Sequence, residues 1–126
     1  MLRLDVEPRV GYLYANVSGQ FTLSSARAIF SQLLAQATRY GRPRIFMDCT
    51  RVVGEMGSDE RMAYGTFIAE EQRRVAGQFS EPLKVAILAL PPVMDYGRLT
   101  QTAANNRGAQ MRASDNRQEL MSWLGV

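Results

Sequence analysis

Residues 83–90, LKVAILAL, decide the fold, because they form a run that is apolar at all but one position. Such a run is typical of a strand buried on both faces of a parallel sheet. Pro91 and Pro92 end the run, since neither residue can donate a hydrogen bond to a neighbouring strand. Residues 44–49, RIFMDC, form a second, mostly apolar run. We therefore predict two central strands at these positions.

Segments with helical periodicity lie around the two central strands. Thr22 or Ser24 can cap the first helix, whose apolar residues share one stripe as far as Gly41, which ends it. The helical period predicts helices at residues 22–41, 58–77, 98–107 and 114–124. Glycines and short polar residues between these segments predict loops at residues 50–57 and 93–97. A short strand is predicted at residues 109–113.

The N-terminal segment has the two-residue period of strands. Residues 2–7 alternate strictly between apolar and charged side chains, and Pro8 is expected to end this strand. A second strand at residues 10–18 follows a short connection, which favours an antiparallel hairpin. The order β-β-α-β-α-β-α-β-α predicts one α/β domain over residues 1–126 with a mixed, mostly parallel five-stranded sheet.

Composition and charge exclude several classes of protein. No apolar run approaches the ~20 residues needed to cross a bilayer. The N-terminus carries a charge at every second residue from Arg3 to Arg9, where a signal peptide would be apolar. The single cysteine, Cys49, suits a reducing compartment. We expect a cytoplasmic protein that does not insert into membranes.

The net charge of +3 does not indicate a nucleic-acid partner. The fifteen Lys and Arg residues are scattered along the chain. Nucleic-acid-binding proteins instead gather their positive charge on one face or in one segment. We predict that nucleic acid is not a partner.

The sequence lacks the residues of common catalytic and metal sites. It has no histidine, which is the usual general base near neutral pH and the commonest metal ligand. One cysteine cannot form a cysteine-rich zinc site, and neither a GxGxxG nor a GxxxxGK[ST] motif occurs. We predict no catalytic residues, no metal and no cofactor; an enzyme built on carboxylates or on Lys84 remains a formal alternative.

Three segments carry a resemblance to a known family: EPRVGYLYANVSGQFTL at residues 7–23, RIFMDCTRVVGEM at residues 44–56, and LKVAILALPPVMDYGRLTQTAANNRGAQMR at residues 83–112. In these the chain resembles the STAS superfamily, the fold of bacterial anti-sigma-factor antagonists, and in particular its small stand-alone bacterial members. The resemblance implies about four helices, mainly on one face of the sheet, and a regulatory role.

Ser58 is the first candidate site residue. In regulatory STAS proteins, a serine at the start of the helix after the central strand is phosphorylated, and Ser58 occupies the equivalent place. The family pattern has an acidic residue before this serine, whereas this chain has Met56 and Gly57, and Asp59 follows directly. We predict that Ser58 caps the helix and is not a regulatory phosphosite, with phosphorylation as the alternative.

A ligand crevice is the second candidate site. Open α/β sheets bind ligands in loops at the carboxyl ends of their strands. The candidates from two such loops and from the helix that follows are Thr50, Ser58, Asp59, Tyr96, Asn105 and Arg107. The alternative for Asn105 and Arg107 is an ordinary helix end, where arginine suits the helix dipole and asparagine tolerates the exit geometry.

The third candidate is an interface on the sheet face that carries Val10, Tyr12 and Tyr14. If the helices lie mainly on the other face, these side chains form an apolar patch, which often marks an interface. We expect a possible homodimer or a partner contact there. The alternative is that each tyrosine only covers its cross-strand neighbour.

Together these features predict a non-catalytic binding or regulatory module for a protein partner or a small ligand. The alternative is a carrier of an apolar or lipid-like molecule, in a pocket near the carboxyl ends of the strands. Flexible methionine side chains adapt to varied ligands. That pocket would be lined by Met56, Met62, Phe67, Met94 and Tyr96, whose more usual place is the core.

Overall fold

The computed structural model describes residues 1–91 and 93–126, with the backbone alone at residues 94–97. Along the described chain the elements are β1 (Leu2–Arg9), β2 (Tyr12–Gln20), α1 (Leu23–Tyr40), β3 (Arg44–Val53), α2 (Ser58–Val75), the short 3₁₀ helix η1 (Ala76–Gln78), β4 (Lys84–Leu88), α3 (Val93–Asn105), β5 (Met111–Ser114) and α4 (Arg117–Leu124).

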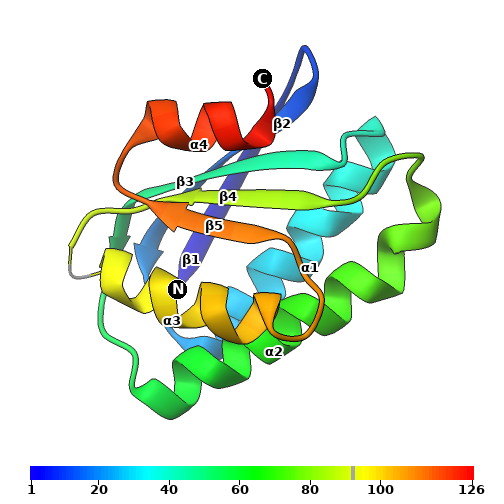
Figure 1. The fold of residues 1–126 in the computed structure, drawn as a ribbon. Helices are drawn as coiled ribbons and strands as arrows, with labels where there is room; N and C mark the ends of the chain where they lie inside the picture. Colours follow the sequence, from blue (N-terminus) through cyan, green and yellow to red (C-terminus); the bar gives the residue numbers. More distant parts are fainter. Residues whose placement is uncertain (92) are drawn as a thin grey trace.

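The strands form one five-stranded sheet in the order β1-β2-β3-β4-β5 (Figure 1). β1 pairs antiparallel with β2, and the remaining neighbours pair parallel. The prediction of a mixed, mostly parallel sheet with an N-terminal hairpin is confirmed. Because β2 to β5 run in one direction, their carboxyl ends lie along one edge of the sheet, at the left in Figure 1. We call this the carboxyl edge, and the opposite one the amino edge.

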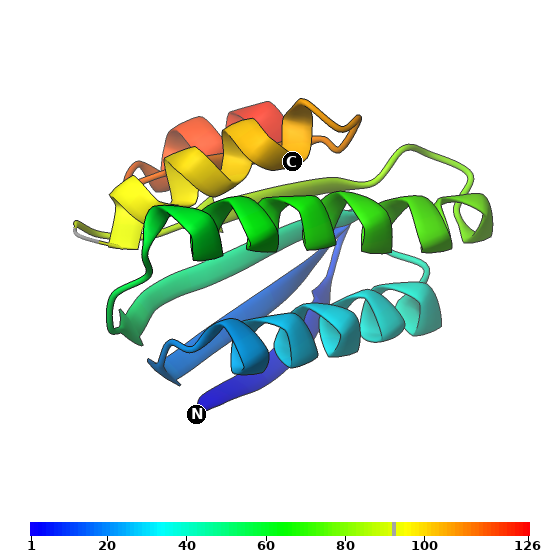
Figure 2. The ribbon, with the colours of Figure 1, turned by 90° about the horizontal axis from the view of Figure 1, so that it is seen from below.

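Helices cover the two faces of the sheet unequally. α1, α2 and α3 lie on one face, and α4 lies on the other (Figures 1 and 2). The larger core lies under the first three helices and buries alternate residues of β2, as its two-residue period predicted: Leu13, Ala15 and Val17. A smaller core lies under α4, where Leu120 packs with Phe46. The prediction that the helices lie mainly on one face of the sheet is thus confirmed.

α1 begins and ends where the sequence indicates. The Thr22 hydroxyl accepts from the Ser25 N–H at 3.1 Å, and the Ser25 hydroxyl accepts from the Thr22 N–H at 3.2 Å. This reciprocal cap satisfies two N–H groups that the helix leaves free. Gly41 follows the last turn in the left-handed conformation, at φ 64°, which glycine adopts without strain.

The hairpin is longer than predicted. β1 continues through Pro8 to Arg9, because it is an edge strand with a single neighbour, where proline is tolerated. β2 begins only at Tyr12, since Val10 and Gly11 form the turn between the two strands. The prediction that Pro8 ends the first strand is therefore wrong.

Two boundaries at the carboxyl edge also differ from the prediction. β3 continues past Cys49 to Val53, because it stays paired with β2 as far as Gln20. The predicted loop at residues 50–57 is therefore a strand in its first half. α3 begins at Val93, so the predicted loop at residues 93–97 is the first part of a helix.

Gly65, which the sequence analysis did not single out, sets the distance between α2 and α3. A Cβ atom at this position would lie 2.6 Å from the Ala103 Cβ and 2.6 Å from the Thr100 carbonyl oxygen. Real Cβ atoms essentially never come this close to other heavy atoms. The two helices pack at this separation because residue 65 has no side chain.

Candidate functional site

A groove opens at the carboxyl edge, between the end of β3 and the residues that follow β4. It has a volume of about 270 Å³, and its described lining is uncharged: Cys49, Thr50, Val52, Val53, Gly54, Leu90, Pro91 and Val93. Val53 and Leu90 are exposed to 59% and 51%. Two large aliphatic side chains thus remain in contact with water beside a groove whose described lining is uncharged.

Thr50 is the predicted site residue that lies in this groove. It belongs to β3 and not to a loop. Its hydroxyl and its N–H both donate to Asp48 Oδ1, at 2.7 Å and 3.1 Å. The hydroxyl and the N–H of Thr50 are therefore engaged within the protein.

Ser58 and Asp59 lie in the exposed first turn of α2, outside the described lining of the groove. Ser58 is not the helix cap, so that prediction is wrong. The cap is Gly57, whose N–H donates to Glu60 Oε1 at 3.2 Å. The helix start is stabilised by carboxylates that complement its dipole.

We expect Ser58 to stay unphosphorylated in the cell of origin. A phosphate would add nearly two negative charges beside Asp59 and Glu60, both in the first turn of α2. Quantitative phosphopeptide mass spectrometry of the protein from its native cells checks this. Stoichiometric phosphate on Ser58 would show that the residue is a regulatory switch after all.

Asn105 and Arg107 do not share a crevice with Thr50, which corrects the prediction. α3 starts at the carboxyl edge and returns to the amino edge, where β5 begins (Figure 1). There the Asn105 amide donates to the Met111 carbonyl and accepts from the Met111 N–H, both at 2.9 Å. Arg107 is exposed in the turn after α3. The side chain of Tyr96 lies outside the described residues.

The predicted patch of Val10, Tyr12 and Tyr14 is not a continuous exposed surface. Val10 is 95% exposed, but it lies in the hairpin turn. Tyr12 is buried in the small core under α4, and Tyr14 is partly buried against it. α4 therefore covers much of the face that the prediction left open.

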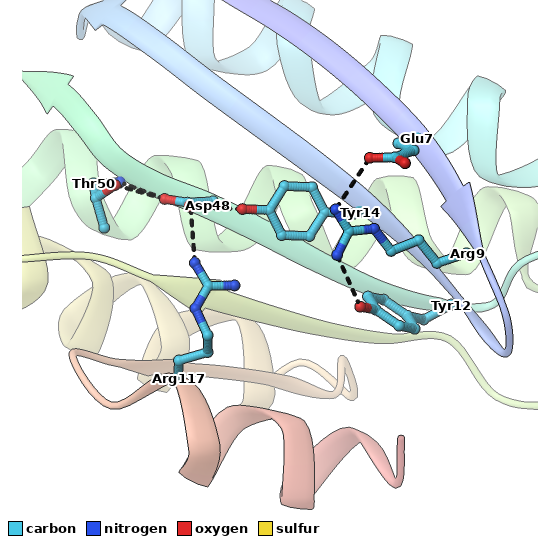
Figure 3. A network of polar contacts seen from close by, with 7 residues as sticks. All are labelled: Glu7, Arg9, Tyr12, Tyr14, Asp48, Thr50 and Arg117. Carbon is cyan, nitrogen blue, oxygen red and sulfur yellow. Dashed lines mark hydrogen bonds and ion pairs between the residues drawn. The ribbon is translucent and has the colours of Figure 1, made fainter.

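A polar network occupies this face instead, centred on Asp48 of β3 (Figure 3). Tyr14 donates its hydroxyl to Asp48 Oδ2 at 2.7 Å, and Arg117 of α4 donates to the same oxygen at 3.1 Å. With Thr50 on the other oxygen, the carboxylate accepts four hydrogen bonds from three residues. The network ties the first turn of α4 to the centre of the sheet.

Arginine side chains extend the network around Tyr14. The Arg9 guanidinium lies 4.3 Å from the centre of the Tyr14 ring and pairs with Glu7 at 3.1 Å. The Arg117 guanidinium lies 5.1 Å from the centre of the Phe46 ring. Such contacts between cations and ring faces are attractive. Each guanidinium also has a carboxylate partner.

The charge states in this network are fixed near neutral pH. Burial raises the pKa of Asp48, but the hydrogen bonds from Thr50 and Tyr14 and the charge of Arg117 outweigh burial, so the pKa is lowered. Burial and the hydrogen bond to Asp48 raise the pKa of Tyr14. Asp48 is therefore ionised and Tyr14 protonated near neutral pH, which suits the hydrogen bond between them.

Sequence reasoning missed Asp48 and Arg117. One signal was present: Asp48 is the single charged residue within the buried segment from Ile45 to Cys49, and it shares a face with Phe46. A buried charge requires a partner. No local pattern indicates that Arg117 is this partner, because it lies 69 positions further along the chain.

The described residues include no group of three His, Cys, Asp or Glu side chains placed to hold a metal ion. Among the described helices, none is long and apolar enough to cross a membrane.

Comparison with known proteins gives a likeness at the level of the fold. No family model and no curated protein matches the sequence. The structure is similar to an anti-sigma factor antagonist from Mycobacterium paratuberculosis, with a TM-score of 0.61 and 12% identity, over 100% of this chain and 96% of that one. It is also similar to an uncharacterised protein with a SpoIIAA-like fold from Shewanella loihica, with a TM-score of 0.52 and 15% identity, over 98% and 93% of the two chains. The chain therefore has a STAS-like fold, as the sequence resemblance implied.

Proposed function

We propose that this protein is a non-catalytic module that binds a protein partner through the groove at its carboxyl edge. The observation that carries the proposal is the pair of exposed aliphatic side chains, Val53 and Leu90, beside a groove that has no charge among its described lining residues. Aliphatic side chains exposed beside a concave site are a surface that a protein partner can bury.

These two side chains can supply only part of the free energy that a stable contact needs. Burying a large aliphatic side chain is worth about 1.5–3 kcal/mol, and association costs at least ~4 kcal/mol in lost freedom. Because Val53 and Leu90 are exposed to only 59% and 51%, burying the remainder is worth less than this, and the two side chains alone would not offset that cost. A stable complex needs further contacts from the partner around these two side chains, as at interface hot spots.

The fold supports a partner that is a protein. One structural neighbour is described as an anti-sigma factor antagonist, a regulator that acts on another protein. We extend only the kind of partner to this chain. The pKa of Asp48 is lowered and that of Tyr14 is raised, so neither group changes its protonation near neutral pH. This supports a role without acid–base catalysis.

Site-specific crosslinking in the cell of origin tests the proposal. The photoreactive residue p-benzoylphenylalanine replaces Leu90 in one strain and Tyr40 in a control strain. Tyr40 is also partly exposed, at the end of α1 near the amino edge. We expect a discrete adduct from position 90 that position 40 does not give.

The identity of the adduct decides between the predicted partners. An adduct with a different protein supports the proposal, whereas an adduct with a second copy of this chain would mean a homodimer through the carboxyl edge. No adduct from position 90, or the same adducts from both positions, would reject the groove as the binding surface.

A further inference from the structure

A small cavity lies inside the protein, between the sheet and the helices α1, α2 and α3. Its volume is about 60 Å³, and apolar side chains make up most of its lining. Among the described lining residues none is charged, and those that carry the argument are Met47, Cys49, Val52, Met56, Tyr64 and Thr100. The cavity is thus an apolar space with few polar groups.

The cavity and the groove at the carboxyl edge adjoin each other. Cys49, Val52 and Val93 line both of them. A molecule that enters the groove between β3 and the start of α3 therefore meets the cavity behind these three side chains. The cavity and the groove therefore share these three residues as a common wall.

Tyr64 brings an unused hydrogen-bond donor to the cavity. Its side chain is 8% exposed, and its ring packs edge-on against Phe21 and Phe30. No described residue accepts a hydrogen bond from its hydroxyl, whereas the Thr100 hydroxyl nearby donates to the Arg61 carbonyl at 3.3 Å. A hydroxyl that makes no hydrogen bond to a described residue can donate to an added acceptor.

The cavity favours neutral chemistry. Burial raises the pKa of the Cys49 thiol to about 12, and burial also raises the pKa of Tyr64. Both groups therefore stay protonated and uncharged near neutral pH. With no charge in the described lining, an ionised ligand would lose its hydration without gaining an ion pair.

We propose that the cavity and groove together bind a small, neutral, mainly aliphatic molecule that carries one acceptor oxygen, such as a short-chain ketone, aldehyde or alcohol. The acceptor receives the hydrogen bond of Tyr64. A cavity of about 150 Å³ can enclose benzene, so this one, at about 60 Å³, holds only part of such a molecule and the rest lies in the groove. A ligand with a full lipid chain is too large. The alternative function given in the sequence analysis, a carrier of an apolar or lipid-like molecule, is therefore limited to small ligands.

Of the methionines predicted to line a carrier pocket, Met56 lines the cavity, whereas Met62 is exposed on α2. Phe67 packs against the core at the edge of the helical layer. Met94 and Tyr96 have side chains outside the described residues. The site is therefore built mainly by buried residues that the sequence analysis did not single out.

Methyl NMR of the intact protein tests this site directly, because its methionines report from inside and outside the cavity. Met47, Met56 and Met111 line it, whereas Met62 and Met121 do not. Titration with hexan-2-one is expected to shift the first three methyl signals in a saturable way and to leave the other two unchanged. Hexanoate, which has the same number of carbon atoms but is charged, is expected to shift none.

Two variants separate specific binding from partition into the core. Tyr64→Phe removes only the hydroxyl and is expected to weaken hexan-2-one binding roughly 3- to 10-fold, the loss of one neutral hydrogen bond. Cys49→Leu fills the junction of cavity and groove and should abolish the shifts, whereas the matched variant Cys49→Ala should keep them.

Equal shifts at all five methionines, no shifts at the lining ones, or unchanged affinity in Tyr64→Phe would overturn the proposal. The test does not involve a protein partner, so its outcome is independent of crosslinking from position 90.

Discussion

Replacing Asp48 with alanine is expected to lower the free energy of unfolding by about 2–4 kcal/mol. The substitution removes the acceptor of four hydrogen bonds and leaves the Tyr14 hydroxyl and both Thr50 donors without their partner. A donor left unsatisfied in a buried site costs its full desolvation energy. Urea unfolding followed by circular dichroism measures the loss.

Two control variants locate this effect. Arg117→Ala should cost no more than about 1 kcal/mol, because the guanidinium is half exposed and solvent screens the ion pair. Tyr14→Phe removes one hydrogen bond and should cost about 1 kcal/mol. If Asp48→Ala is as stable as wild type, the carboxylate does not hold α4 to the sheet.

The contribution of Asp48 should also depend on pH in a defined direction. Its pKa is lower in the folded protein than in the unfolded chain, so its stabilising effect is complete above the ordinary value of about 3.9. The effect is lost as the pH falls through the lower, folded-state pKa. The stability difference between wild type and Asp48→Asn should therefore be constant near neutral pH and shrink below about pH 4.

Gly65→Val is expected to lower the free energy of unfolding by at least about 3 kcal/mol. Its Cβ would meet the Thr100 carbonyl oxygen at 2.6 Å, and backbone cannot rotate away as a flexible side chain can. α2 and α3 must separate, and the cavity between helices and sheet opens with them.

Gly77→Val is the matched control, because no heavy atom lies within 4 Å of its Cβ position. It should change stability by less than about 0.5 kcal/mol, as surface substitutions usually do. Thermal unfolding of both variants, monitored by circular dichroism, gives the comparison. Equal effects of the two substitutions would mean that the α2–α3 contact does not limit stability.

Much of the fold could be predicted from the sequence, because local patterns indicate the helices and strands. The apolar runs of β3 and β4, the cap at Thr22 and the stop at Gly41 each act within a few residues. The predicted ends of strands were wrong where pairing with a neighbouring strand determines them. β3 extends to Val53 because β2 remains beside it, and no local signal records that pairing.

The candidate site was less accessible, since its parts come from distant segments. Thr50 was predicted and lies in the groove, but Leu90 joins it only through the pairing of β3 with β4. Asn105 was misplaced because the crossover helix carries it to the opposite edge of the sheet. Tyr64 looks like an ordinary core residue in sequence, and its unused hydroxyl becomes visible only in three dimensions.

The measurement that tests the central claim most directly is the affinity for the partner crosslinked at position 90. Calorimetric titration compares wild type with Leu90→Asp and with the control Tyr40→Asp. A charge at the centre of an apolar contact should weaken binding at least about 10-fold, and the control should bind within about twofold of wild type. Equal affinity of Leu90→Asp and wild type would contradict partner binding at the carboxyl edge.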